Sequence, residues 1–260
     1  MNVELAKIQA ELGKMPGISL DEMANIRLMD RIDSKFVAPV SLLPALIESM
    51  RSGFKVQVIN NIRIAPYATQ YLDTPDLKMF IMHQNGQLNR QKIRIRSYVD
   101  SNLSFLEIKN KNNKGRTKKT RVAVPLAQLA SVEDLNDKKQ FLEEHSLFDS
   151  DNLKPSLSNT FQRITFVNNK ATERITVDFD LFFRNYRTGN ETALHQLMIL
   201  ELKQDGWQHS DFRDILSQLR IKPTSFSKYC IGIVLTNPES KYNRFKSKCT
   251  LINKLIQETL

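Results

Sequence analysis

The sequence lacks the features that mark secreted proteins and integral membrane proteins. It holds only two cysteines in 260 residues, Cys230 and Cys249, and their spacing is not that of a metal site. No window approaches the roughly 18 consecutive apolar residues that a membrane span needs. The N-terminal stretch MNVELAKIQAEL is charged and does not have the pattern of a signal peptide. We therefore expect a cytoplasmic protein whose thiols are reduced.

Internal repeats and low-complexity linkers are also absent. The apolar fraction is 41%, which is enough for one large domain or two small ones. The formal net charge is +10, which favours a polyanionic partner such as nucleic acid, an anionic membrane surface or a phosphate-rich molecule. Charge alone does not choose among these partners.

Residues 89–111 predict two strands joined by a polar turn at residues 100–102. Because successive side chains of a strand point to opposite faces, one face of the first strand is cationic and the other is largely apolar. The cations on that face are Arg90, Lys92, Arg94 and Arg96. Like charges at intervals of about 7 Å repel one another, so this row indicates that an anion binds against it.

Other predicted strands also place charged side chains on one face. They are Arg31, Asp33 and Lys35, then Glu107 and Lys109, Lys119 and Arg121, Arg163, Arg174 and Asp178, and finally Glu201 and Lys203. An open sheet with one solvated face would show the same alternation. Since these positions are mainly Arg and Lys, we expect instead a sheet that closes into a barrel with an anion-binding interior.

Helical patterns interrupt the strands at the beginning, middle and end of the chain. Helices are predicted in residues 1–29, with a break at residues 15–17, and in residues 40–51, 126–148, 211–219 and 241–260. Ser19 and Glu22 have the spacing of a capping box. Further strands are predicted in residues 30–37, 55–64, 68–72, 116–124, 156–167, 173–179 and 197–203. Because these elements do not alternate as βαβ units, the fold class is α+β with one antiparallel sheet.

The charged segments occur in the order RIDSKF, QYLDTPDL, HQNGQLNRQKIRIRSY, FLEIKNKNNKGRTKKTR, ERITVD, ELK and FSKY. Together they resemble the VTC domain, the polyphosphate polymerase domain of the vacuolar transporter chaperone family and a branch of the triphosphate tunnel metalloenzymes. The resemblance covers residues 28–236. It leaves N-terminal helices in residues 1–27 and a basic C-terminal helix in residues 237–260.

This resemblance implies a closed, eight-stranded antiparallel β-tunnel with flanking helices. It also implies transfer of the γ-phosphate of ATP to a growing polyphosphate chain, with a divalent metal, Mn²⁺ or Mg²⁺. The residues implied as catalytic are Lys35, Arg94, Arg96 and Lys109. Those implied as phosphate ligands are the same four with Lys119, Arg121, Arg163, Arg174, Ser227 and Lys228. The implied metal ligands are Glu201 and, as a second carboxylate, Glu107.

The chain departs from the broader superfamily at the ExExK signature, where RIDSKF holds one acid, Asp33. This fits the VTC branch better than the triphosphatase branch. We find neither an SPX-like regulatory domain nor a membrane domain in the sequence. We therefore expect other proteins to supply control and export, with a separate membrane protein as one candidate.

Three alternatives stay open. A hydrolase of tripolyphosphate or nucleoside triphosphates would need the same basic walls, and so would a non-catalytic polyphosphate-binding module without a working metal site. The charge also permits nucleic-acid binding. Aromatic residues are not interleaved with the basic positions, however, and no nucleic-acid motif occurs, so we expect no specific nucleic acid. The sequence does not indicate the oligomeric state.

Overall fold

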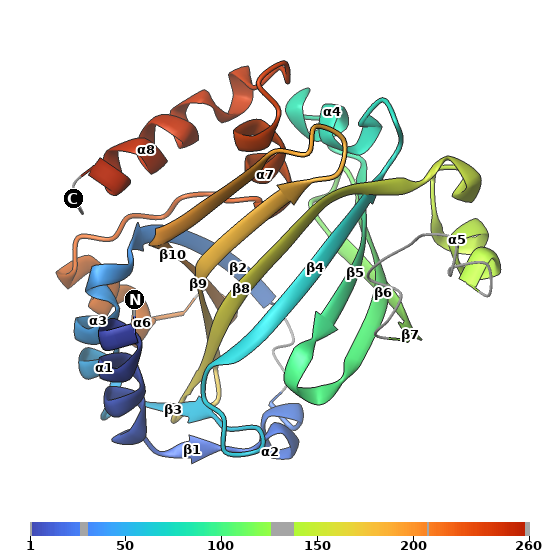
Figure 1. The fold of residues 1–260 in the computed structure, drawn as a ribbon. Helices are drawn as coiled ribbons and strands as arrows, with labels where there is room; N and C mark the ends of the chain where they lie inside the picture. The colour runs from blue at the N-terminus through green and yellow to red at the C-terminus, as the bar shows by residue number, and fades with distance from the viewer. Residues whose placement is uncertain (1, 27–30, 126–137, 207, 258–260) are drawn as a thin grey trace.

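The computed structural model describes residues 2–26, 31–125, 138–206 and 208–257, which form one ten-stranded sheet with flanking helices (Figure 1). The strands are β1 (Gly17–Ile18), β2 (Arg31–Pro39), β3 (Phe54–Gln57), β4 (Ala65–Asp73), β5 (Arg90–Tyr98), β6 (Leu103–Lys111), β7 (Thr117–Val124), β8 (Lys154–Asn168), β9 (Glu173–Asn185) and β10 (Glu191–Asp205). The helices are α1 (Asn2–Gly13), α2 (Leu20–Ala24), α3 (Leu43–Met50), α4 (Lys78–Gln84), α5 (Lys139–His145), α6 (Asp211–Gln218), α7 (Lys228–Thr236) and α8 (Lys246–Gln257). The short 3₁₀ turns include η1 (Val40–Leu42), η2 (Val99–Ser101), η5 (Ser150–Asn152) and η6 (Asn243–Phe245).

Eight strands follow one another in the sheet in the order β2, β10, β9, β8, β4, β5, β6, β7, and every neighbouring pair is antiparallel. The short strand β3 pairs with β8, and β1 pairs with β3 in parallel. The α+β class and the antiparallel sheet are therefore confirmed. Within the described residues no pairing joins β2 to β7, so closure of the tunnel stays a prediction.

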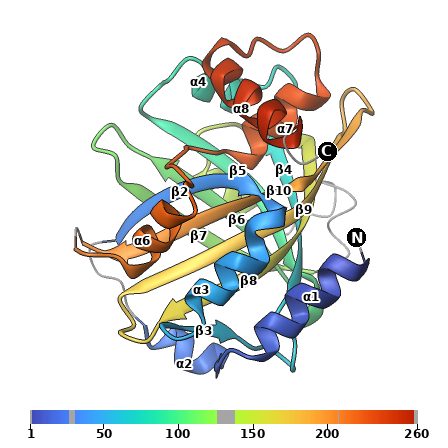
Figure 2. The same ribbon diagram turned by 90° about the vertical axis from the view of Figure 1, so that its left-hand side faces the viewer.

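Several long strands have one face covered by helices, and this is why their residues alternate. Along β5, the residues at 91, 93, 95 and 97 are buried, whereas the basic residues between them are only partly buried. Helices α1, α3 and α6 cover the apolar side of β2, β10, β9 and β8 (Figure 2). Leu142 of α5 packs on the apolar side of β5 and β6. The charged faces of these strands consequently point to the opposite side, toward one another.

Helix α7 fills one end of the space enclosed by the charged faces. It is mostly apolar because most of it is buried, with Tyr229, Ile231 and Ile233 in one core with side chains of β8, β9 and β10. Gly232 lets the helix approach closely, since a Cβ there would lie 2.5 Å from Leu157 Cδ2. Helices α4 and α8 lie at the same end of the molecule (Figure 1).

The local predictions differ from the structure in several places. The strands predicted in residues 173–179 and 197–203 extend further, as β9 and β10, and the helix predicted from residue 241 begins only at Lys246. In the run 55–64 only β3 is a strand, because Asn60 and Asn61 have φ of 49° and 63° and turn the chain so that Ile59 pairs with Ile62. Of the predicted helix 126–148, residues 126–137 lie outside the described residues and α5 occupies only its later part. The capping box of Ser19 and Glu22 is confirmed. The division at residues 27 and 237 stays a prediction.

Candidate anion-binding site

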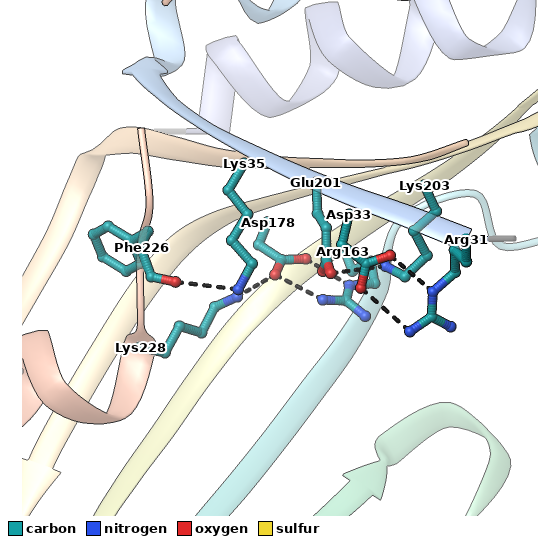
Figure 3. A network of polar contacts seen from close by, with 9 residues as sticks. All are labelled: Arg31, Asp33, Lys35, Arg163, Asp178, Glu201, Lys203, Phe226 and Lys228. Carbon is teal, nitrogen blue, oxygen red and sulfur yellow. Dashed lines mark hydrogen bonds and ion pairs between the residues drawn. The ribbon is translucent and has the colours of Figure 1, made fainter. Parts of the chain in front are cut away.

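Strands that are far apart in the sheet meet at residues 226–228, at the start of α7. Lys35 Nζ of β2 donates to the carbonyl oxygen of Phe226 at 3.1 Å, and Lys92 Nζ of β5 donates to Ser227 Oγ at 3.0 Å. Four strands separate β2 from β5 in the sheet order. Lys228 in turn pairs with Asp178 of β9 (Figure 3). The sheet must therefore curl around this short segment, which brings its charged faces together.

Ser227 is held in place by the helix that it begins. Its side chain accepts a hydrogen bond from the backbone N–H of Cys230, so it is the N-cap of α7. The same oxygen accepts the hydrogen bond from Lys92. The positive end of the helix thus points into the basic space, where its dipole adds to the attraction for an anion.

One carboxylate of this space, on β6, is held between cations of the two neighbouring strands β5 and β7. Glu107 of β6 has no exposed side-chain surface and accepts two hydrogen bonds from Arg94, at 2.6 and 2.8 Å. Lys119 of β7 pairs with its other oxygen. Burial raises the pKa of Glu107, but Arg94 and Arg96 outweigh burial and lower that pKa to about 2. Glu107 is therefore a permanent negative charge within the basic wall.

A second group of ion pairs lies on the opposite wall, where the side chains of β2, β8, β9 and β10 converge (Figure 3). Arg163 binds both carboxylate oxygens of Asp178, at 2.5 and 2.7 Å. Lys203 pairs with Glu201 at 3.0 Å. Although burial opposes it, Lys203 holds the pKa of Glu201 well below its ordinary range. Both carboxylates are therefore ionised at neutral pH.

The enclosed space nevertheless carries more positive than negative charge. Its basic side chains are Lys35, Lys92, Arg94, Arg96, Lys109, Lys119, Arg163, Lys203 and Lys228, and its carboxylates are Glu107, Asp178 and Glu201. The crowding shows in Lys109, whose pKa falls to about 6 because of Arg94 first, then burial and Arg96. Burial and the neighbouring Arg94 likewise lower the pKa of Arg96 to about 10. Such a surplus of charge favours a bound polyanion.

This arrangement agrees with the family to which the sequence can be assigned. A family model described as the VTC domain matches residues 30–237. The chain belongs to the VTC-domain family. The resemblance expected from the sequence is thereby confirmed.

Solved structures similar to this VTC domain are distant in sequence. The PH1819 protein from Pyrococcus horikoshii OT3 is 14% identical, and the match covers 78% of this chain and 98% of that one with a TM-score of 0.41. A putative adenylyl cyclase, HpAC1 from Hippeastrum, described with a dominant triphosphatase activity, is 12% identical; its match covers 79% of this chain and 96% of that one with a TM-score of 0.48. These likenesses are too weak to carry an argument. No curated protein sequence matches the chain.

The predicted site residues of the VTC domain fall into two groups. The structure brings together Lys35, Arg94, Arg96, Lys109, Lys119, Arg163, Ser227 and Lys228, with Glu107 and Glu201 among them. Two others point elsewhere. Arg174 donates to the carbonyl oxygens of Met23 and Ile26 at the end of α2, at 2.9 and 3.3 Å. Arg121 is exposed on β7 and lies 4.5 Å from the centre of the Phe105 ring.

Sequence reasoning passed over three members of the site. Lys92 belongs to the basic row and lies on the same strand face as Arg94, but it was not predicted as a phosphate ligand. Asp178 was placed on a charged face without the role of partner to Arg163. Tyr67 had no signal at all, yet its ring centre lies 5.9 Å from the Arg96 guanidinium and 4.8 Å from that of Arg163. An aromatic ring between two guanidinium groups holds both in place.

The carboxylates of the site differ in how well they could hold a metal ion. The described residues contain no group of three or more His, Cys, Asp or Glu side chains in ligating positions. Both oxygens of Glu107 are engaged by cations, whereas Glu201 has an ion pair only with Lys203 among the residues that the structure describes. Mg²⁺ is commonly held by one or two carboxylates together with substrate phosphates. Glu201 fits that requirement, and Glu107 as a ligand stays a prediction.

No helix in the described parts of the chain combines the length and apolar character needed to cross a bilayer.

Proposed function

We propose that this VTC domain binds ATP and polyphosphate in its basic interior and transfers the γ-phosphate of ATP to the end of the polyphosphate chain. The observation that carries the proposal is the meeting of β2, β5 and β9 at residues 226–228, which encloses a surplus of cations. A phosphate chain is the ligand that such an enclosure suits, because it has a negative charge on every unit and no bulky substituent. Tripolyphosphate is the simplest probe of the site.

Arg94 and Arg96 act on the transferring phosphate in this proposal. A guanidinium fork can bind two phosphate oxygens at once, and it keeps its charge at any physiological pH. Glu107 fixes the orientation of Arg94 through two hydrogen bonds. Transfer in line between two phosphates needs little covalent help from the protein, so positioning and charge stabilisation supply the catalysis.

Lys35 and Lys109 complete the catalytic group from two different strands. Lys35 is held at the start of α7 by its hydrogen bond to Phe226. The charges of Arg94 and Arg96 lower the pKa of Lys109, and the charge of Glu201 raises it. Their ammonium groups would neutralise the charge that develops on the leaving diphosphate and on the attacking chain end.

The remaining predicted phosphate ligands lie on the walls around this group or at the ends of the path. They are Lys119, Arg121, Arg163, Arg174, Ser227 and Lys228. The contacts of Arg174 with α2 and the exposure of Arg121 favour places at the ends of the path rather than at its centre. Glu201 would hold a divalent metal, Mn²⁺ or Mg²⁺, which supplies charge neutralisation on the bound phosphates. The surroundings of Glu107 favour a role as counter-charge to Arg94.

The decisive assay incubates the purified protein with ATP and Mn²⁺ or Mg²⁺ and examines the product on a polyphosphate gel beside a free-phosphate assay. A ladder supports the polymerase. Free phosphate without a ladder supports hydrolysis of triphosphate, and tight polyphosphate binding without either product supports a non-catalytic binding module.

The double variant Arg94→Ala with Arg96→Ala tests the site itself. We expect loss of tripolyphosphate affinity by about a hundredfold or more, since each charge-assisted pair contributes roughly 1.5–3 kcal/mol. The matched control is Arg184→Ala, which removes an arginine that is 59% exposed in its side chain and pairs with Glu191 on the surface. Normal tripolyphosphate binding by the double variant would show that the site has been assigned wrongly.

Both cysteines are free thiols, which supports the cytoplasm as the place of action. A membrane partner that accepts the polymer belongs to the same proposal. Such a partner would be identified by its binding to the polyphosphate product as the product leaves this protein.

A further inference from the structure

The basic segment after α7 is anchored at one particular place. Phe245 of η6 is 1% exposed and packs on α4, with its ring centre 6.1 Å from that of Phe80 and 5.6 Å from that of His83. Such an aromatic anchor fixes the position of its neighbours in the sequence. The segment 244–248 is therefore docked at the end of the molecule where β5 begins.

This anchor brings two cations to the turn that leads into β5. The guanidinium of Arg244 lies directly against Gly86, so closely that a Cβ at Gly86 would overlap it. Lys248 Nζ lies 5.4 Å from the centre of the Phe245 ring. Arg244 therefore contacts the turn that leads into β5, and Lys248 lies over Phe245, close enough to act electrostatically on His83 and Arg244.

The first two cations of β5 reach the same region from the other side. Arg90 donates to the carbonyl oxygen of Gln87 at 2.9 Å, within the turn that Arg244 contacts. Lys92 is bound to Ser227. Both cations act electrostatically on His83, whose Nδ1 is 2.9 Å from the Cys230 sulfur. The pKa of His83 is lowered to about 3, first by burial, then by Lys92 and Arg90, and then by the two cations of the C-terminal segment.

Among the described residues, no carboxylate balances this charge. In the parts of the chain that the structure describes, none of the four cations forms an ion pair with a carboxylate, and their electrostatic neighbours are other cations, His83 and the thiols of Cys230 and Cys249. Burial raises the pKa of the Cys230 thiol, so it is neutral at physiological pH. Four unbalanced cations held together destabilise the folded protein, and a bound anionic ligand would offset this repulsion.

These cations continue the row of the central site outward. Along β5 the order is Arg96, Arg94, Lys92, Arg90, at steps of about 7 Å, and Arg244 and Lys248 stand at the end of the row. A surface pocket opens beside Arg90 and is lined further by Lys111, Arg116 and Lys118. The row extends well beyond the reach of a triphosphate held by Arg94 and Arg96. Its outer part therefore suits a longer phosphate chain.

We propose that Arg90, Lys92, Arg244 and Lys248 form an outer subsite that binds the units of a linear polyphosphate lying beyond the central triphosphate site. This inference rests on the proposed function, because it needs a phosphate chain in the centre. It adds a role for the C-terminal segment, which selects long chains over short ones. Helix α7 blocks the rest of this end, so the phosphate chain passes between α7 and the start of β5.

The test compares tripolyphosphate with a long-chain polyphosphate in direct binding measurements on the full chain. The variant is Arg244→Gln with Lys248→Gln. The matched control is Lys241→Gln with Lys246→Gln, which removes the same charge from exposed positions of the same segment. We expect the variant to lose about tenfold in affinity for the long chain, as for two modest charge-assisted contacts, and to keep tripolyphosphate affinity within about twofold. The control should change neither, and thermal unfolding should show that both variants are folded.

Three results would overturn the inference. One is that the variant binds the long chain as tightly as the wild-type protein does. If the wild-type protein binds tripolyphosphate, this result leaves the proposed function intact. Another is an equal loss in the control, which would mean attraction by overall charge. The third is loss of binding to vesicles of anionic phospholipid without loss of long-chain binding, which would assign the surface to a membrane. Failure of the wild-type protein to bind either phosphate chain would overturn the proposed function, and the inference with it.

Discussion

Lys109 should take up a proton when a phosphate chain binds. Its pKa is lowered to about 6, chiefly by Arg94 and then by burial and Arg96. At pH 8 only about 1% of these side chains are therefore charged in the free protein. A phosphate chain against Arg94 and Arg96 cancels their repulsion, so the pKa of Lys109 returns toward its ordinary value of 10.5. The expected uptake by this one group is about one proton per ligand.

The uptake can be measured by isothermal titration calorimetry of tripolyphosphate binding at pH 8 in two buffers with different ionisation enthalpies. Other groups also exchange protons, including Lys92, whose pKa burial lowers to about 8, and the ligand itself. The variant Lys109→Met removes the contribution of Lys109 and leaves the others. The difference between the wild-type protein and the variant should therefore be about one proton.

The same linkage sets the pH dependence of affinity. Between pH 6 and about pH 10, binding to the wild-type protein should lose up to about tenfold per pH unit more than binding to Lys109→Met. Lys139→Met is the control, because Lys139 pairs with Asp151 on the surface, away from the site. If the wild-type protein and Lys109→Met exchange the same number of protons, Lys109 does not face the bound phosphates and the reasoning fails.

Three further predictions concern the walls of the site. Glu107→Gln should lower the free energy of unfolding by about 3 kcal/mol, measured by urea denaturation, since it leaves the buried Arg94 without its counter-charge; an unchanged midpoint would contradict this. Gly232→Ala should lower stability by about 1–3 kcal/mol and weaken tripolyphosphate binding, because the new methyl group would collide with Leu157 and push α7 away from the sheet; a fully stable variant with normal binding would show that α7 does not position the site. Lys109 binds fewer protons in the folded than in the unfolded chain between about pH 6 and pH 10.5, so the melting temperature of the ligand-free wild-type protein should rise more over that range than that of Lys109→Met; parallel melting curves for the two proteins would count against the lowered pKa.

Several parts of the fold and the site were predictable from local sequence. The alternation along β5 depends only on strand geometry, so it assigned Arg94 and Arg96 to one face and Ile93 and Ile95 to the other before any fold was known. The capping box at Ser19 was predictable for the same reason, since it involves groups three residues apart. The family resemblance then predicted that the charged faces line one anion-binding tunnel.

Other features depend on contacts between residues far apart in the chain, and local patterns do not contain these. The apolar run 230–235 could be a buried strand or a buried helix, and only the packing against β8, β9 and β10 decides for α7. Whether Glu107 serves as a metal ligand or as an ion-pair partner depends likewise on how close Lys119 and Arg94 come to it.

The amino-acid sequence by itself determined which side chains share a face, because the period of a strand is a local property of the backbone. Only the tertiary structure decided that the faces of β2, β5 and β9 meet at residues 226–228, because the curl of a sheet results from twist and packing summed over many strands. The site exists at that meeting point. A row of cations on one strand becomes an enclosed anion site only when the other strands bring theirs to it.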